Sequence, residues 1–133
     1  MSLAGETQPT SLQLELAANP GSVGVARHAV AEFAGENGAD ADAVAVAVSE
    51  TVTNAVVHAF ADRPPGCVEV RAKLNGEGLL VIVSDDGNGI NPNPNSPGLG
   101  FGLALVASVA EEMGITRSPQ GGTSVRMRFA AAA

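Results

Sequence analysis

Three polar side chains recur at intervals of four residues within one apolar segment. In the stretch VSETVTNAVVHAF, Glu50, Asn54 and His58 follow each other at this spacing. Residues four apart share one face of an α-helix, so a carboxylate, an amide and an imidazole would form a single stripe. Oxygen ligands of this kind suit Mg²⁺, which takes few protein groups when phosphates complete its shell. The carboxylate of Glu50 could also accept a proton from a nucleophile.

The stripe has an ordinary alternative, which is the solvent face of an amphipathic helix. Such a face is normally rich in Lys, Glu, Gln and Arg. Glu50 is the only formally charged residue between Ala43 and Ala61. We therefore expect this helix to be largely buried and the stripe to be a functional site. His58, taken by itself, is more often a structural histidine, and we assign it no role.

A first glycine-rich segment follows an apolar run. The segment SDDGNGI contains Asp85, Gly87 and Gly89 at alternate positions. A carboxylate at the end of a strand can accept a hydrogen bond from an exocyclic amine, and glycines let the backbone approach a flat ring. The alternative is a turn made of ordinary turn residues.

A second glycine-rich segment, GLGFGLALV, opens a predicted helix with Gly98, Gly100 and Gly102. Backbone N–H groups at a helix start, together with the helix dipole, favour an anion such as phosphate. The alternative is a flexible loop before a core helix. The dinucleotide-binding pattern fails because Leu103 replaces its third glycine, and the P-loop Gly-Lys-Ser/Thr is absent from the chain.

Hydrophobic periodicity predicts the elements that would position these residues. Ser22 is the predicted cap of the first helix, and Asp40 or Asp42 that of the second. Helices on one face of a mixed, mostly antiparallel sheet make a two-layer α/β sandwich. The predicted order is strand 11–16, helix 22–38, helix 40–61, strand 67–74, strand 79–85, helix 103–113, short strand 114–116 and strand 121–129.

Composition narrows the classes of protein. The 133 residues suit one domain at 11–130, with a disordered tail or cloning remainder at 1–10 and a frayed end at 131–133. The net charge of −7 argues against a nucleic-acid-binding surface. Cys67 is the only cysteine, which excludes an intrachain disulfide and fits a reducing, cytoplasmic setting. No apolar run is long enough for a membrane-spanning helix.

The polar helix and the two glycine segments, in this order, resemble the N, G1 and G2 boxes of one ATPase superfamily. It contains gyrase, heat-shock chaperones, histidine kinases and mismatch-repair ATPases. GGTS at 121–124 resembles its Gly-Thr element. The resemblance covers Leu12 to Phe129 and implies the Bergerat-type ATP-binding fold. As a short single domain, the chain looks most like anti-sigma factors with serine kinase activity, of the RsbW and SpoIIAB type.

The resemblance implies a role for each matching position. Glu50 would act as the base on the incoming hydroxyl, and Asn54 would coordinate Mg²⁺. Asp85 would accept a hydrogen bond from the adenine amino group. The other positions that would contact the nucleotide are Gly87, Gly89, Gly98, Leu99, Gly100, Phe101, Gly102 and Thr123.

The same resemblance implies a function. Such a protein would bind ATP or ADP with Mg²⁺, sequester a sigma factor, and phosphorylate a serine of an anti-anti-sigma (STAS-type) partner, thereby regulating transcription. It would be cytoplasmic and a possible homodimer, with no membrane or direct nucleic-acid contact. The segment Ile90–Pro97 between the glycine boxes is short and has no Lys or Arg. This favours an alternative, a nucleotide-gated binding module without phosphoryl transfer. A structural domain without any ligand is the third hypothesis.

Overall fold

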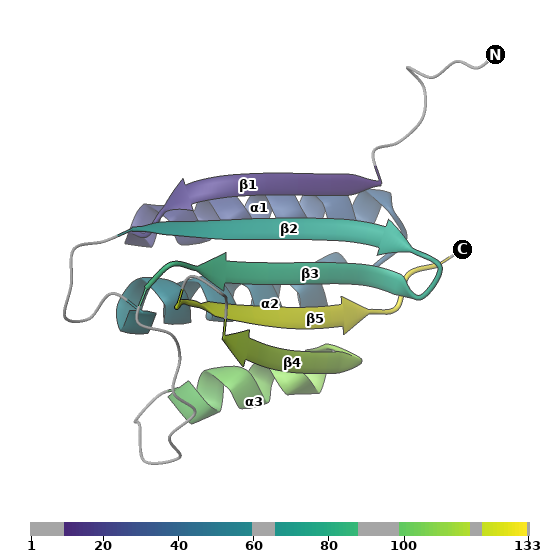
Figure 1. The fold of residues 1–133 in the computed structure, drawn as a ribbon. Coiled ribbons are helices and arrows are strands. Elements are labelled where there is room, and N and C mark those ends of the chain that lie inside the picture. Colours follow the sequence, from purple (N-terminus) through teal and green to yellow (C-terminus); the bar gives the residue numbers. More distant parts are fainter. Residues whose placement is uncertain (1–9, 60–65, 88–98, 118–120, 133) are drawn as a thin grey trace.

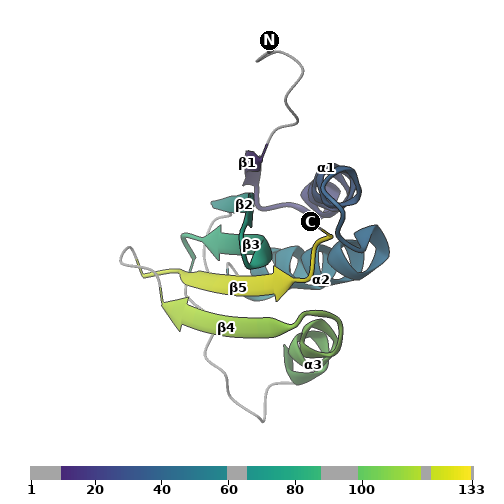
Figure 2. The same ribbon diagram turned by 90° about the vertical axis from the view of Figure 1, so that its right-hand side faces the viewer.

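The computed structural model describes residues 10–59, 66–87, 99–117 and 121–132, which form a sheet covered by helices (Figures 1 and 2). The elements are β1 (Ser11–Ala17), α1 (Pro20–Glu36), α2 (Ala41–Asn54), the π-helix η2 (Ala55–Ala59), β2 (Cys67–Asn75), β3 (Gly78–Asp85), α3 (Leu99–Val109), β4 (Glu112–Arg117) and β5 (Thr123–Phe129).

The five strands form one sheet in the order β1-β2-β3-β5-β4. Each of the four neighbouring pairs is antiparallel. Figure 2 shows the helices on one side of this sheet. The two-layer α/β sandwich predicted from the sequence is therefore confirmed, and the described pairs are all antiparallel.

Buried and exposed side chains alternate along the strands, so the sheet has a core face and an outer face. Val125, Met127 and Phe129 of β5 are buried, whereas Arg126 is exposed between them. The helices complete the core with β-branched side chains such as Val48, which is fully buried. This period of two is what the sequence showed in the same segments.

Helix α1 begins earlier than predicted. Asn19, not Ser22, is its N-cap, and the Asn19 Oδ1 accepts the backbone N–H of Ser22 at 3.1 Å. Pro20 occupies the first helical position, where its missing N–H is not needed. Ser22 lies inside the first turn and donates its hydroxyl to the carbonyl of Ala17 at 2.6 Å. The prediction of Ser22 as the cap was wrong because Asn-Pro forms a better helix start.

Helix α2 begins as predicted and ends differently. Asp40, one of the two predicted caps, accepts the backbone N–H groups of Asp42 and Ala43. The α-helix ends at Asn54 and continues as η2, so the prediction of one regular helix to about residue 61 was wrong. A π-turn is wider than an α-turn. The backbone therefore departs here from the regular helical spacing on which the stripe of Glu50, Asn54 and His58 was predicted.

Two further boundaries differ from the prediction. Helix α3 ends at Val109, and Met113 lies in β4 opposite Met127. The apolar residues at 109, 110 and 113 also fit a helical period, which caused the error. Strand β4 is therefore longer than the predicted segment 114–116.

Near the C-terminus, where fraying was expected, Ala131 forms a bridge with Ala39, and the N–H of Ala132 donates to the carbonyl of Gly38 at 2.9 Å.

Candidate functional site

Four element ends meet at one end of the molecule (Figure 1). They are the C-terminal ends of α2 and β3 and the starts of α3 and β5. Contacts of α2 with α3, and of η2 with β3, agree with this arrangement. The residues that the sequence singled out on these elements are Glu50, Asn54, Asp85, Thr123 and the helix start Leu99, Gly100, Phe101 and Gly102.

Asn54, the last residue of α2, carries an unpaired polar atom in the protein interior. Its exposed fraction is 5%, and its amide nitrogen Nδ2 has no hydrogen-bond partner among the described residues. Thr51, also buried, is instead satisfied, because its hydroxyl donates to the carbonyl of Ala47 at 2.9 Å. An unsatisfied buried amide is unfavourable by about 1–3 kcal/mol, and such groups often have a functional cause.

Glu50 precedes Asn54 by four residues in the α-helical part of α2. Its side chain is partly exposed, and the described part of the chain provides it with no hydrogen bond or ion pair. The carboxylate is therefore accessible to a bound molecule at this end of the helix.

Asp85 ends β3 and is 7% exposed. Its Oδ1 accepts the backbone N–H of Gly87 at 2.9 Å, and the backbone N–H of Thr123 also donates to the carboxylate. Burial raises the pKa of Asp85, although the two backbone hydrogen bonds oppose that shift. A carboxylate has about four lone-pair positions, so this one can still accept a further donor.

The start of β5 lies unusually close to the end of β3 because of Gly122. A Cβ atom at this position would overlap the carbonyl oxygen of Asp85. Thr123, which follows, is 2% exposed. Gly122 was not among the predicted site residues, although the Gly-Gly doublet before Thr123 was visible in the sequence.

The start of α3 supplies the remaining described part of this end. Leu99, Gly100, Phe101 and Gly102 form its first turn, so their backbone N–H groups are at the helix N-terminus, as an anion site requires. Gly89, Gly98 and the segment Ile90–Pro97 lie outside the described residues. So does the side chain of His58, whose backbone is part of η2.

Arg117 is a cation that sequence reasoning missed. It is the last residue of β4 and pairs with Thr123 in the register. Directly opposite residues of an antiparallel pair point to the same face of the sheet, so Arg117 lies on the Thr123 side. It is exposed, and no ion pair with another described residue is recorded for it. The predicted strand at 114–116 did not include Arg117, so only the observed strand pairing shows that Arg117 is a neighbour of Thr123.

The cavities recorded among the described residues lie elsewhere. They measure about 280, 290 and 500 Å³ and lie on the uncovered face of the sheet and beside the β2–β3 turn. The segments 60–65, 88–98 and 118–120, which adjoin the candidate site in sequence, are outside the description. The buried polar chemistry of Asn54 and Asp85 therefore identifies the candidate site better than cavity size does.

A family model for the histidine kinase-like ATPase domain matches residues 16–129. The chain belongs to this family. The match covers the polar helix, both glycine segments and the Gly-Thr element. The described helices of this histidine kinase-like ATPase domain include none that is long and apolar enough to cross a membrane.

Relatives of this ATPase domain include anti-sigma F factors. It is 28% identical to that of Heyndrickxia coagulans, over 88% of this chain and 90% of that protein. It is 29% identical to that of Clostridium novyi, over 64% of this chain and 67% of that protein. It is also 39% identical to blue-light-activated histidine kinase 2 of Erythrobacter litoralis, over 59% of this chain but only 24% of that protein. The chain thus spans about a quarter of that histidine kinase.

Solved structures agree with the fold of this ATPase domain. The RsbU and RsbW domains of Rv1364c from Mycobacterium tuberculosis superpose with a TM-score of 0.70 at 27% identity, over 94% of this chain and 34% of that one. The ATP-binding domain of PrrB from the same organism gives 0.58 at 20% identity, which supports the fold alone. The resemblance to the RsbW and SpoIIAB type of protein, and the ATPase fold, are therefore confirmed.

Proposed function

We propose that this domain is an Mg-ATP-binding anti-sigma factor that also phosphorylates a serine of an anti-anti-sigma protein. The observation that carries the proposal is Asn54, a buried amide at the end of α2 whose Nδ2 has no partner among the described residues. The similarity to anti-sigma F factors supports the choice of partner class. Serine transfer, the sigma factor and the antagonist are parts of the proposal, as are a cytoplasmic location and a homodimeric state.

The adenine would be recognised by the carboxylate of Asp85. Its remaining lone pairs can accept a hydrogen bond from the exocyclic amine, and Gly87 and Gly89 would leave room for the flat ring. Thr123 is next to this carboxylate through its backbone N–H. The backbone amides from Gly98 to Gly102 would hold phosphates at the start of α3.

The residues at this end also fit an Mg²⁺ ion that is held mainly by the nucleotide. No group of three or more His, Cys, Asp or Glu side chains is placed to hold a metal within the described ranges. Asn54 would supply its Oδ1 as one oxygen ligand, and phosphates and water would supply the others. Bound Mg²⁺ would neutralise charge that develops on the transferred phosphoryl group.

Glu50 would act on the acceptor serine. Its carboxylate would take the hydroxyl proton while the serine oxygen forms a bond to the γ-phosphorus of ATP. The bond from that phosphorus to the β–γ bridging oxygen breaks, which leaves ADP and a phosphoserine. The partial exposure of Glu50 at the end of the helix is consistent with an acceptor that comes from a separate protein.

A nucleotide-gated binding module without phosphoryl transfer is the second candidate. The segment Ile90–Pro97 has no Lys or Arg to contact a γ-phosphate. Arg117, which pairs with Thr123, is the described cation on this side. The two candidates share the nucleotide site and differ in the chemistry of Glu50.

One experiment distinguishes the candidates. The wild-type chain and Glu50→Gln are titrated with Mg-ATP by calorimetry and then incubated with a purified anti-anti-sigma protein whose serines are mapped by mass spectrometry. The proposal expects equal nucleotide affinity, and phosphoserine with the wild type only. Binding without any phosphoserine would support the module, and equal phosphorylation by both chains would exclude Glu50 as the base. Absence of binding to either chain would reject both candidates.

A further inference from the structure

One face of the sheet is not covered by any described helix. The helices all lie on the other side in Figures 1 and 2. Strand β3 is central, and its outward side chains Leu80 and Ile82 are partly buried. Two apolar residues therefore lie near the middle of a face that is open in the described part of the molecule.

The strand register surrounds these two residues with cations. Lys73 of β2, Leu80 of β3 and Arg128 of β5 lie in one row across the sheet. Arg71, Ile82 and Arg126 form the next outward row. Adjacent strands are about 4.8 Å apart, so the backbones of the two cations in a row are about 10 Å apart. We refer to these six residues as the basic sheet patch.

The patch is an exception within an acidic protein. The chain has seven Lys and Arg residues and a net charge of −7, yet four of the seven lie in these two rows. The two cations of each row are on β2 and β5, which are separated by β3 and so are not direct cross-strand neighbours.

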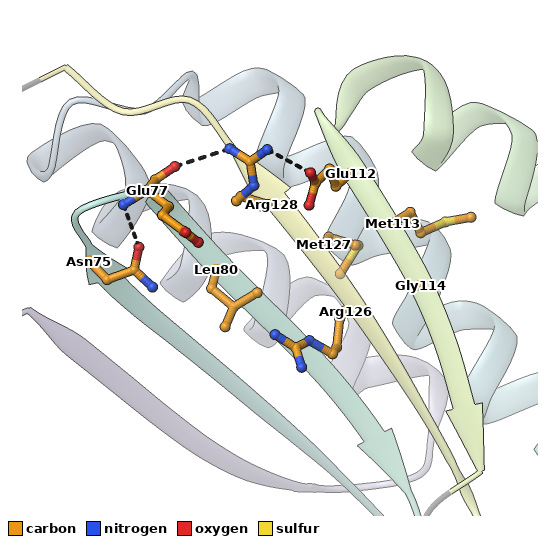
Figure 3. A pocket seen from close by; sticks show the side chains of 9 residues that line it. All are labelled: Asn75, Glu77, Leu80, Glu112, Met113, Gly114, Arg126, Met127 and Arg128. Carbon is orange, nitrogen blue, oxygen red and sulfur yellow. Dashed lines mark hydrogen bonds and ion pairs between the residues drawn. The ribbon is translucent and has the colours of Figure 1, made fainter.

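The four cations differ in how they are paired. Arg128 contacts Glu111 at 2.9 Å. It also contacts Glu112 at 3.0 Å and donates to the carbonyl of Glu77 (Figure 3). Arg71 has an exposed contact of 3.4 Å with Glu69, which is worth little in water.

Lys73 and Arg126 are the other two cations. Both are exposed, and neither has a recorded hydrogen bond or ion pair with another described residue. Two cations of the patch are therefore available to a partner.

The patch is also hollowed on both sides of β3. A depression of about 280 Å³ is lined by Leu80, Arg126 and Arg128, and also by Glu77 and Glu112, both of which contact Arg128 (Figure 3). A second, of about 290 Å³, is lined by Leu80, Arg71 and Lys73. Each depression thus combines the apolar wall of Leu80 with two cations; the first is also lined by Glu112, whose carboxylate pairs with Arg128, which leaves Arg126 as its available cation.

We propose that the basic sheet patch binds an acidic segment of a partner protein, with apolar side chains between its carboxylates. Carboxylates would meet Lys73 and Arg126, and the apolar side chains would fill the depressions beside Leu80. A second copy fits less well, because a two-fold dimer centred on this patch would bring its four cations against the same four. A nucleic acid fits less well too, since the patch has no aromatic ring on which bases could stack.

This surface is additional to the nucleotide site. Outward residues of β3 and β5 point away from the face that carries Asp85 and Thr123, because neighbouring residues of a strand alternate between faces. The proposal does not depend on ATP binding or on phosphoryl transfer. Its test can therefore be done without nucleotide.

The test uses the full chain and a fluorescent synthetic peptide of alternating Glu and Leu, followed by fluorescence anisotropy. Lys73→Glu and Arg126→Glu should each weaken binding by about tenfold or more, because a charge reversal also introduces repulsion. Arg27→Glu makes the same charge change at an exposed position on α1 and should alter affinity less than about twofold. Amide chemical shifts should move on β2, β3 and β5, and binding should weaken with salt.

Four outcomes would overturn the proposal. The first is equal loss of affinity in Arg27→Glu and Arg126→Glu, and the second is equal binding of a peptide of alternating Lys and Leu. The third is a homodimer that Arg126→Glu dissociates, which would make the patch a self-interface. The fourth is binding of single-stranded DNA, but not of the acidic peptide, that Arg126→Glu abolishes. Thermal melts of each variant show that the fold is retained, as expected for exposed sites.

Discussion

At the scale of single residues, Asn54 gives the most direct test of the nucleotide site. Asn54→Leu replaces a buried amide, whose Nδ2 has no partner in the described part of the chain, by an apolar side chain of similar size, so the free domain should be as stable or more stable. Mg-ATP at about one hundred times its Kd should raise the wild-type Tm by roughly 10 °C. The variant should lose this rise in a thermal melt.

The neighbouring Thr53 offers a matched control, because it is exposed on the same helix. Thr53→Val should keep the Mg-ATP-dependent rise in Tm. If Asn54→Leu kept it as well, the proposed role of Asn54 would be untenable.

The protonation of Asp85 should make both the stability of the domain and its affinity for ATP depend on pH. Burial raises its pKa above the usual value of 3.8, so the folded domain disfavours the ionised carboxylate. The stability of the free domain should therefore fall as pH rises from the usual pKa through the raised one. Adenine binding, which uses the ionised form, should strengthen over the same range.

Asp85→Asn separates these two effects. At neutral pH it should remove the unfavourable ionisation and raise or preserve the Tm of the free domain. It should also weaken ATP binding by about 10- to 100-fold, because a hydrogen bond to a charged acceptor is lost. Calorimetry and thermal melts across acidic pH measure both, and an unchanged pH profile of ATP affinity in the variant would contradict the assignment.

At the scale of elements, the contact between the ends of β3 and β5 depends on Gly122. A Cβ there would overlap the backbone carbonyl of Asp85, so Gly122→Ala must displace one strand end. We expect a loss of about 1–3 kcal/mol in the free energy of unfolding, as for other overpacked sites. Nucleotide affinity should fall further than stability alone would require, since the Asp85 carboxylate moves relative to Thr123.

Gly114 of β4 is the matched control for that change. A Cβ at Gly114 has no atom within 4 Å, and its backbone is not in the left-handed region. Gly114→Ala should leave stability unchanged or raise it by up to about 1 kcal/mol. Urea denaturation of both variants measures the free energy of unfolding. Equal destabilisation by the two substitutions would show that the close contact at Gly122 does not determine the stability of the strand ends.

Most of the element pattern could be predicted from the sequence because hydrophobic periodicity reports burial. In β5, the alternation of apolar and polar residues in the sequence matches the observed core face and the outward Arg126. The predicted helix boundaries were wrong where two neighbouring residues could both act as a cap. Asn19, for example, caps α1 in place of the predicted Ser22. The π-turn after Asn54 could not be predicted, because the sequence AVVHA at Ala55–Ala59 contains no residue that distinguishes a π-helix from an α-helix.

At the scale of the site, the sequence named Asn54 and Asp85 but could not show that one has an unpaired amide and the other a raised pKa. Both properties arise from tertiary burial. Gly122 and Arg117 were missed because their relevance comes from strand pairing. Residues far apart in sequence become neighbours there, and no spacing along the chain encodes this.

At the scale of the whole molecule, the charge distribution predicts dependence on the metal. The chain has a net charge of −7. Four of its seven Lys and Arg residues lie on the uncovered face of the sheet, away from Asp85. Free ATP is itself strongly anionic, so it should be repelled unless Mg²⁺ offsets its charge. Removal of Mg²⁺ with EDTA should therefore lower ATP affinity by about tenfold or more.

The repulsion should also depend on ionic strength and on the number of phosphates. Without Mg²⁺, ATP affinity measured by calorimetry should rise as salt is added, because screening shortens the range of like-charge repulsion. ADP, which carries less charge, should lose less affinity in EDTA. Arg117→Gln should enlarge the EDTA effect, since Arg117 is the described cation beside Thr123. ATP affinity that is equal with and without Mg²⁺ at low salt would show that backbone amides and Arg117 suffice, and that Asn54 holds no metal.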